Sequence, residues 1–304
     1  MSTASEPSTN HSLCPVCESP SIQLWRPRGL SRTLAPADLQ ITDAHYGLTL
    51  ELWKCPDCSF VFATGEEMAT LSSLYQELSD PDYEKGFATR AAQMRWLLNW
   101  GLKIRPKVRS VLEIGAGIGL LTAQARAAGL HAVGIEPSRS LVAAARRMQA
   151  VDLIQGAFPH PALEGCRFDL VYAVDVIEHV ADPLAFLKAC VCMLNPGGCL
   201  VVVTPDIGSV TARLMGRRWW HFRLAHVGYF NRHSMQCAAG RAGLTICKEI
   251  RAVWFFPIHY LLERVAVYLP LSRHLERYAA KGVLSKTIRL NLHDSNVFFM
   301  EKNA

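Results

Sequence analysis

The feature that most constrains the fold is the stretch Val-Leu-Glu-Ile-Gly-Ala-Gly-Ile-Gly at residues 111–119. An apolar run followed by closely spaced glycines is typical of a buried strand that turns sharply into a helix, with bare backbone at the turn. Such a turn accommodates a nucleotide-like ligand. Gly115, Gly117 and Gly119 alternate, whereas dinucleotide-binding turns are spaced G-x-G-x-x-G and would need a glycine where Leu120 stands. The spacing therefore disfavours NAD.

Strand and helix patterns alternate on both sides of this turn. The strands predicted from apolar runs are Val111–Ile114, His131–Ile135, Leu153–Gln155, Leu170–Val174 and Leu200–Val203. The predicted helices are Ala88–Leu102, Leu120–Ala128 and Ser138–Met148. Buried strands separated by helices predict an α/β fold with a parallel sheet wrapped by helices. Two later runs, Ile288–Asp294 and Val297–Met300, are expected to add an antiparallel pair to the sheet.

An acidic residue follows the second predicted strand. Glu136 lies nineteen residues after Gly117, about where nucleotide-binding sheets place a carboxylate that accepts hydrogen bonds from both ribose hydroxyls. A single glycine or acid is explained by ordinary turn chemistry, but the joint spacing predicts a cofactor site.

The same residues resemble a known family. The glycine turn is similar to motif I of the class I S-adenosylmethionine-dependent methyltransferases, and the likeness continues through residues 168–180 and Thr204-Pro-Asp. The resemblance implies a Rossmann-like class I methyltransferase sheet with flanking helices, and S-adenosyl-L-methionine as the cofactor. It implies cofactor contacts from Glu113, Gly115, Gly117, Gly119, Glu136, Gln155 and Asp175. Gln155 stands where the family often has an acid for the adenine amino group.

The segment after the fourth predicted strand carries a candidate reaction centre. Asp175, Glu178 and His179 are spaced i, i+3 and i+4, so a helical turn would place them on one face. The pattern resembles the Glu-x-x-Glu-His motif of metal-assisted O-methyltransferases, with aspartate in place of the first glutamate. This resemblance implies a catalytic Mg, Mn or Zn ion, with His226 as a further candidate ligand.

Two alternatives stay open at this centre. His179 or His226 could act without a metal, as the base that removes the proton of the acceptor. Glu178 and His179 could instead only cap the turn and pack beneath the acceptor pocket. The catalytic candidates are therefore Glu178, His179 and His226.

Two C-x-x-C pairs precede the α/β region. Cys14 and Cys17 form the first pair, and Cys55 and Cys58 form the second. Four cysteines spaced in this way predict a closed, structural zinc site, in preference to a redox pair or unpaired core thiols. The expected strands of this zinc ribbon are Leu48–Trp53 and Phe60–Phe62.

Charge and hydropathy limit the partners and the compartment. Residues 1–65 carry four Lys or Arg against six Asp or Glu, which disfavours nucleic acid as a partner. The N-terminus lacks the basic-then-apolar pattern of a signal peptide, which predicts a cytoplasmic protein. The apolar stretch 253–271 is interrupted by Pro257, Glu263 and Arg264, so it is not expected to span a membrane.

The expected organisation has four parts: a disordered tail (1–10), the zinc ribbon (11–65), a helical connector (66–105) and the methyltransferase domain (106–304). Within the last part, Arg213–Arg223 interleaves four arginines with three aromatic residues. This composition suits a phosphate-bearing, ring-containing or lipid acceptor or peripheral membrane contact, and equally a helix with its aromatics packed inward.

The predicted function is O-methylation of a small-molecule, glycan or lipid-linked acceptor. The alternatives are sugar C-methylation, RNA methylation, and cofactor binding without catalysis.

Overall fold

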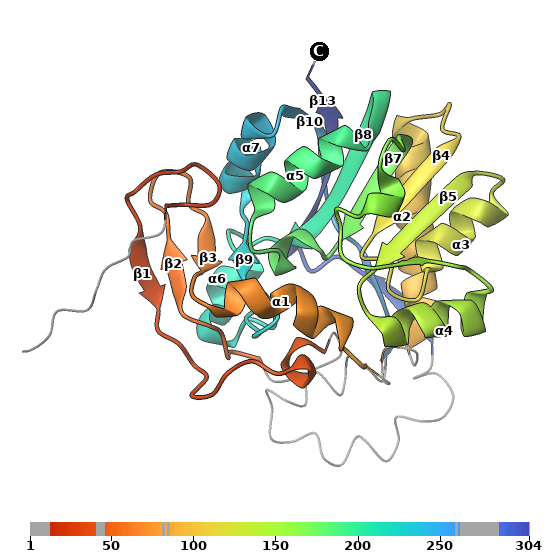
Figure 1. Cartoon of the computed structure of the whole chain (residues 1–304). Coiled ribbons are helices and arrows are strands. Elements are labelled where there is room, and N and C mark those ends of the chain that lie inside the picture. The colour runs from red at the N-terminus through yellow and green to blue at the C-terminus, as the bar shows by residue number, and fades with distance from the viewer. Residues whose placement is uncertain are drawn as a thin grey trace, which may run out of the picture.

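The structure is a computed structural model of the chain, and it describes residues 13–40, 46–80, 83, 86–258, 261 and 286–303. Its centre is a seven-stranded sheet with the order β10-β13-β8-β7-β4-β5-β6 (Figure 1). The strands are β4 (Ser110–Ile114), β5 (His131–Glu136), β6 (Ile154–Gln155), β7 (Phe168–Val174), β8 (Leu194–Pro205), β10 (Leu244–Arg251) and β13 (Ser295–Lys302). Strands β4 to β8 pair in parallel, whereas β13 is antiparallel to both β8 and β10. The predicted α/β fold is confirmed.

Both faces of this sheet carry apolar side chains. Successive side chains of a strand point to opposite sides, so an apolar stretch contributes to both faces. On β7, Val171 and Ala173 join one core while Leu170 and Tyr172 join the other, and all four are fully buried. The helices packed in the first core are α5 (Pro183–Cys192) and α7 (Arg232–Arg241), and those in the second are α2 (Phe87–Ile104) and α3 (Leu120–Ala127). Figure 1 shows α5 and α7 side by side on one face of the sheet.

Several helices begin at residues whose side chains cap them. Ser138 and Asp182 each accept a hydrogen bond from the backbone N–H three residues later, at 3.2 and 2.8 Å, which is the usual N-cap arrangement. The helix predicted from Ser138 is therefore α4 (Arg139–Gln149), with Ser138 as its cap. Further helices are α1 (Glu67–Gln76) and α6 (Val210–Met215), and the 3-10 turns are η1 (Pro36–Leu39), η3 (Pro161–Leu163), η4 (Ile177–His179) and η5 (Gly216–Arg218).

A smaller sheet joins the N-terminal segment to the α/β region. Its order is β1-β2-β3-β9, formed by β1 (Gln23–Arg26), β2 (Leu52–Lys54), β3 (Val61–Ala63) and β9 (Gly228–Tyr229). Strand β9 comes from the segment after β8 and pairs antiparallel with β3. Phe60, next to β3, packs on Phe230 with ring centroids 4.5 Å apart. The two parts of the chain therefore share a sheet and a core.

The last strands differ from the prediction of an antiparallel pair. Residues Ile288–Asp294 and Val297–Met300 do not pair with each other. Instead, β12 (Thr287–Leu290) pairs with β11 (Trp254–Pro257), and β13 pairs with β8 and β10. Strand β10 has no counterpart among the predicted strands. The prediction was wrong because the partner of a strand depends on contacts far along the chain, not on its own apolar pattern.

The boundaries of the other elements differ less from the prediction. Strand β8 begins at Leu194, ahead of the predicted Leu200, and β2 and β3 overlap the two predicted ribbon strands. The disordered tail predicted for residues 1–10 lies outside the described residues, and the division of the chain at residues 65 and 105 stays a prediction. In the described part of the chain, no helix is long and apolar enough to cross a membrane.

Candidate active site

The glycine turn lies between β4 and α3. Gly115, Gly117 and Gly119 have φ angles of +70°, +56° and +72°, in the left-handed region that favours glycine. A Cβ on Gly115 would lie 2.5 Å from Val176 Cγ2, and one on Gly117 would lie 2.7 Å from Tyr83 Oη. Glycine at these positions permits the left-handed turn and the close approach of Val176 and Tyr83.

Glu136, at the end of β5, lies against this turn. Its Oε2 accepts a hydrogen bond from the Gly117 N–H at 2.8 Å, and its Oε1 accepts one from the Ser138 N–H at 2.9 Å. Burial raises the pKa of Glu136 to about 7, because a charged carboxylate is poorly solvated there. The structure thus brings the predicted acid to the predicted turn.

Glu113 lies beneath the turn. Its Oε2 accepts hydrogen bonds from the Thr122 N–H at 2.8 Å and from the Thr122 hydroxyl at 2.6 Å. Burial raises the pKa of Glu113 to about 7 as well. Glu113 therefore ties β4 to the first turn of α3, and its direct contact with a cofactor stays a prediction.

Gln155 and Asp175 extend the row of predicted residues to either side. Gln155 is exposed and lies opposite Glu136 in the parallel register of β5 and β6. Asp175 directly follows β7 with a φ of +52°, and its buried Oδ1 has no hydrogen-bond partner among the described residues. The predicted residues therefore line the carboxyl ends of four neighbouring strands, where open α/β sheets bind their ligands.

Tyr83 is a further member of this crevice that the sequence did not reveal. Its hydroxyl is near Gly117, and the guanidinium of Arg90 lies 3.9 Å from the centre of its ring. Tyr83 belongs to no motif and meets the turn only in the folded chain, so no sequence signal marks it.

Glu178, His179 and His226 lie together. One ligand atom from each residue lies within 4.8 Å of the other two. Glu178 and His179 belong to η4, and the N–H of Val227, next to His226, donates to the Glu178 carbonyl at 2.8 Å. The structure thus brings the three catalytic candidates into one cluster. Asp175, before η4, is not among the described residues grouped there.

Several donor atoms of this cluster are free for a ligand. Glu178 Oε1 and His226 Nδ1 are buried, and neither has a hydrogen-bond partner within the described residues; Thr204 donates to the other Glu178 oxygen at 3.0 Å. On His179, Nδ1 lies 2.8 Å from the Ala225 carbonyl oxygen. A carbonyl only accepts, so Nδ1 carries the proton and Nε2 does not.

These residues fit a divalent metal ion. Buried polar atoms without partners are rare in folded proteins, and one carboxylate oxygen with two imidazole nitrogens is a donor set that transition metals and zinc accept. Three protein ligands also leave positions open for an acceptor.

The surroundings of the cluster shift the pKa values of its three side chains towards their neutral forms. Burial lowers the pKa of His179 to about 4 and that of His226 well below its ordinary value. Burial and the neighbouring Asp175 raise the pKa of Glu178 well above its ordinary value. Both imidazoles are therefore neutral at pH 7, the form that ligates metals.

His221 and Asp294 form a neighbouring pair that was also missed. His221 Nε2 lies 3.2 Å from Asp294 Oδ2, and the His221 ring stacks on His226 with centroids 5.8 Å apart. The pair joins residues 73 positions apart, so no local pattern could have indicated it.

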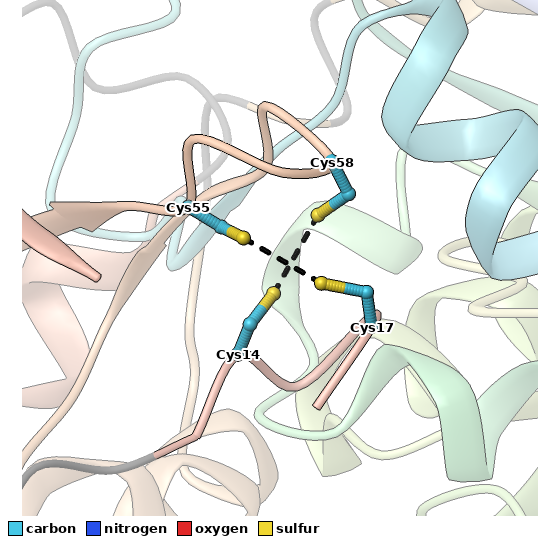
Figure 2. Close-up of side chains that lie close together, drawn as sticks. All are labelled: Cys14, Cys17, Cys55 and Cys58. Carbon is cyan, nitrogen blue, oxygen red and sulfur yellow. Dashed lines mark hydrogen bonds between the residues drawn. The ribbon is translucent and has the colours of Figure 1, made fainter. Parts of the chain in front are cut away.

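The four predicted cysteines converge on one point, as Figure 2 shows. Cys14 Sγ lies 3.6 Å from Cys58 Sγ, and Cys17 Sγ lies 3.5 Å from Cys55 Sγ. These separations are too long for disulfides, and they approach the roughly 3.8 Å expected between thiolates about 2.3 Å from one tetrahedral ion. The hydrogen bond between Cys58 and Cys14 lowers the pKa of the Cys14 thiol to about 5 and raises that of Cys58. The four sulfurs fit a tetrahedral metal with no open position.

A glycine turn and an acid at the carboxyl ends of a parallel sheet form the arrangement in which open α/β sheets bind nucleoside cofactors. Residues 83–249, more than half of the chain, match the family described as "Methyltransferase domain". The chain therefore belongs to this family of methyltransferase domains.

Curated relatives match a shorter stretch. The protein named "Ubiquinone biosynthesis O-methyltransferase" of Bradyrhizobium diazoefficiens is 37% identical over 122 residues, which are 39% of this chain and 44% of that protein. The protein of the same name from Rhodopseudomonas palustris is 35% identical over 122 residues, with the same coverage. The chain thus spans less than half the length of these relatives.

A solved structure supports the fold. The methyltransferase of Haloferax volcanii, solved in complex with the Trm112 methyltransferase activator, has a TM-score of 0.52 and 15% identity, covering 80% of this chain and 100% of that chain. At this identity the likeness shows the fold alone.

The raised pKa of Glu136 predicts a pH dependence for cofactor binding. Ribose hydroxyls donate to an ionised carboxylate, so binding favours the charged form and must release the proton that Glu136 holds below about pH 7. Affinity for S-adenosylhomocysteine should be constant above this pH and fall by up to about tenfold per pH unit below it. Calorimetry between about pH 5.5 and pH 8 measures this slope.

Two variants separate Glu136 from the other buried acid. Glu136→Gln should bind more weakly and lose the slope, because the amide does not titrate. Glu113→Gln should keep the slope, since the Glu113 carboxyl has the same raised pKa but is occupied by Thr122. A slope that persists in Glu136→Gln would contradict the role given to Glu136.

Proposed function

We propose that the protein transfers the methyl group of S-adenosylmethionine to a hydroxyl oxygen of a small-molecule acceptor held at a divalent metal centre. The observation that carries this proposal is the cluster of Glu178, His179 and His226, with buried donor atoms that lack partners within the described residues. In the reaction the bond between the methyl carbon and sulfur breaks and a carbon–oxygen bond forms. The electron pair of the broken bond stays on sulfur, and the hydroxyl proton must leave.

The cofactor side of the proposal uses the strand ends. The open backbone of Gly115, Gly117 and Gly119 would receive the methionine part of the cofactor, and Glu136 would accept hydrogen bonds from the ribose. Gln155 lies one strand further out, where the adenine is expected. Asp175, past β7, would lie on the side of the transferable methyl group.

The low pKa values of the two histidines favour a metal over an imidazole base. Moving a proton from a phenol with a pKa of about 10 to His179, whose pKa is about 4, is unfavourable by on the order of 8 kcal/mol. Burial lowers the pKa of His226 further from neutrality as well. A divalent ion, when bound, lowers the pKa of a coordinated hydroxyl and so makes its proton leave more easily.

The chain's own residues hold the proposed ligands in place. Thr204 donates to Glu178 Oε2 and leaves Oε1 for the ion, and Ala225 holds the proton of His179 on Nδ1. Imidazole ligands suit Mn or Zn better than Mg. The hydrogen bonds around the ligands resemble the outer contacts that orient histidines in metal sites.

The four-cysteine cluster is proposed to hold a structural zinc ion. Four thiolates complete a tetrahedral site, so the ion can stabilise the small N-terminal sheet but cannot bind an acceptor. Cys14, Cys55 and Cys58 are buried in the same core as Phe60 and Phe62, which supports a folding role for the metal.

The segment Arg213–Arg223 informs the acceptor class. Trp219 and Phe222 are buried in the core, as expected for inward-packed aromatics, whereas Arg213 and Arg217 are exposed. The exposed arginines support a phosphate-bearing or lipid-linked acceptor as a finer proposal within the small-molecule class.

Metal binding tests the proposal directly. Protein treated with a mild chelator and still holding one zinc equivalent should bind one Mn²⁺ ion, and His226→Ala should weaken this binding by at least about tenfold because one ligand is lost. Methyl incorporation from labelled cofactor into a cell-extract acceptor should fall in parallel. Calorimetry and manganese electron paramagnetic resonance give the affinities.

His233→Ala is the matched control. His233 is exposed on α7, and its Nε2 lies 3.2 Å from the Asp57 carbonyl oxygen; it is not part of the cluster, so its loss should change neither Mn²⁺ affinity nor methyl incorporation. A wild-type protein that binds no Mn²⁺, Mg²⁺ or second Zn²⁺ ion, and that transfers methyl groups equally well after chelation, would exclude the metal centre.

A further inference from the structure

A side chain of the N-terminal segment, Tyr75, contacts His179 of the proposed metal centre. Tyr75 lies on α1, ahead of residues 83–249 that match the methyltransferase family. Its hydroxyl lies 2.6 Å from His179 Nδ1 and 3.4 Å from the Ala225 carbonyl oxygen. The Tyr75 ring stands edge-on to the His179 ring, with centroids 5.7 Å apart and an angle of 84°.

The hydrogen-bond geometry determines which atom carries the proton between His179, Tyr75 and the Ala225 carbonyl. Because the Ala225 oxygen lies 2.8 Å from His179 Nδ1 and can only accept, the proton is on Nδ1. Tyr75 Oη then shares this proton as a second acceptor, and its own O–H is directed towards Ala225. Nε2 of His179 keeps its lone pair.

Packing keeps the Tyr75 side chain where it is. Tyr75 packs against Leu39, Leu78 and Ala225, a small cluster of the N-terminal segment and the loop before β9. The Leu78 carbonyl accepts a hydrogen bond from the Ser138 hydroxyl at 2.7 Å, which anchors the end of this segment beside the cofactor crevice. The phenol is therefore a fixed neighbour of His179.

We propose that Tyr75 is a positioning residue that holds the His179 imidazole in its Nδ1–H form and so leaves Nε2 available as the metal ligand. The proposal rests on the proposed function, in which His179 is a metal ligand. It means that a residue outside the matched methyltransferase region completes the centre. Outer hydrogen bonds of this kind change metal affinity by about 10- to 100-fold when they are removed.

Tyr75→Phe tests the proposal, with Tyr172→Phe as the matched control. Tyr172 is also fully buried, and its hydroxyl donates to the Leu97 carbonyl in the core, away from the cluster. Tyr75→Phe should bind Mn²⁺ about tenfold more weakly than the wild type, whereas Tyr172→Phe should bind it normally. Both variants should bind S-adenosylhomocysteine with unchanged affinity.

A second measurement reports on the imidazole without any metal. Long-range proton–nitrogen NMR of histidine-labelled, Mn²⁺-free protein distinguishes the two neutral imidazole forms, and His179→Gln identifies the His179 signal. The wild type should show the Nδ1–H form, and Tyr75→Phe should show a shifted signal or a fraction of the Nε2–H form. Tyr172→Phe should match the wild type.

The outcomes separate this proposal from the proposed function. Equal Mn²⁺ affinities and identical His179 signals in the wild type and Tyr75→Phe would overturn the role of Tyr75 while leaving the metal centre intact. If the wild type binds no Mn²⁺, the proposed metal centre is wrong, and the NMR signal of His179 alone tests the positioning role of Tyr75. An Nε2–H form in the wild type would overturn the positioning role.

Discussion

Gly117→Arg is expected to abolish binding of S-adenosylmethionine without unfolding the protein. The backbone of Gly117 is left-handed, with a φ of +56°, and even a Cβ there would lie 2.7 Å from the Tyr83 hydroxyl. The arginine side chain is therefore expected to displace Tyr83 and to enter the space at the turn where the cofactor is proposed to bind. The dissociation constant measured by calorimetry should rise by about 100-fold or more, which corresponds to about 2.7 kcal/mol.

Gly129→Arg provides the control for backbone strain. Gly129 has a φ of +80°, and no atom of the described residues lies within 4 Å of the position of its Cβ. This variant should lose about 1–2 kcal/mol of stability and bind the cofactor normally. Undiminished binding by Gly117→Arg would show that the cofactor site is not at this turn.

Cys55→Ser is expected to empty the four-cysteine site and to lower the unfolding midpoint by about 10 °C or more. The binding energy of a structural zinc ion is folding energy, and a chain of this size loses a few degrees for each kcal/mol. Cys55 is fully buried in the core that includes Phe60 and Phe62, so serine also adds an unpaired hydroxyl there. Elemental analysis and calorimetric unfolding measure the two effects.

Cys192→Ser serves as the control for the loss of a thiol. Cys192 is exposed at the end of α5, so this variant should keep one equivalent of zinc and the wild-type midpoint. Methyl transfer should fall in Cys55→Ser alone, because β3 pairs with the strand that follows His226. A Cys55→Ser protein that retains full zinc would contradict the proposed ligand set.

The parallel half of the fold could be predicted from local sequence. Strands β4 and β5 are mostly buried and consist mainly of apolar residues, and each matches its predicted range to within one residue. Strand β10 mixes buried and exposed side chains at the edge of the sheet. Its sequence does not reveal that β13 would be inserted between it and β8, because that register depends on distant contacts.

The candidate site likewise contains some residues that the sequence could predict and others that it could not. Residues in short motifs, such as Gly117 and Glu178, could be found because the chemistry fixes their spacing. Tyr75 could not be found, since it meets His179 only in the folded chain, 104 residues away. The spacing of Asp175 suggested a third ligand on a helical face, but Asp175 has a left-handed backbone and the helical turn η4 begins only after it.

Because β9 pairs with β3, the N-terminal segment and the methyltransferase region depend on each other structurally. A chain reduced to residues 83–249 would lose β3, which would leave one edge of β9 open and Phe230 without its partner Phe60. A recombination event that moved this region alone would deliver an enzyme with a damaged acceptor side. The part of the chain that must be inherited together is therefore longer than residues 83–249 and includes β3.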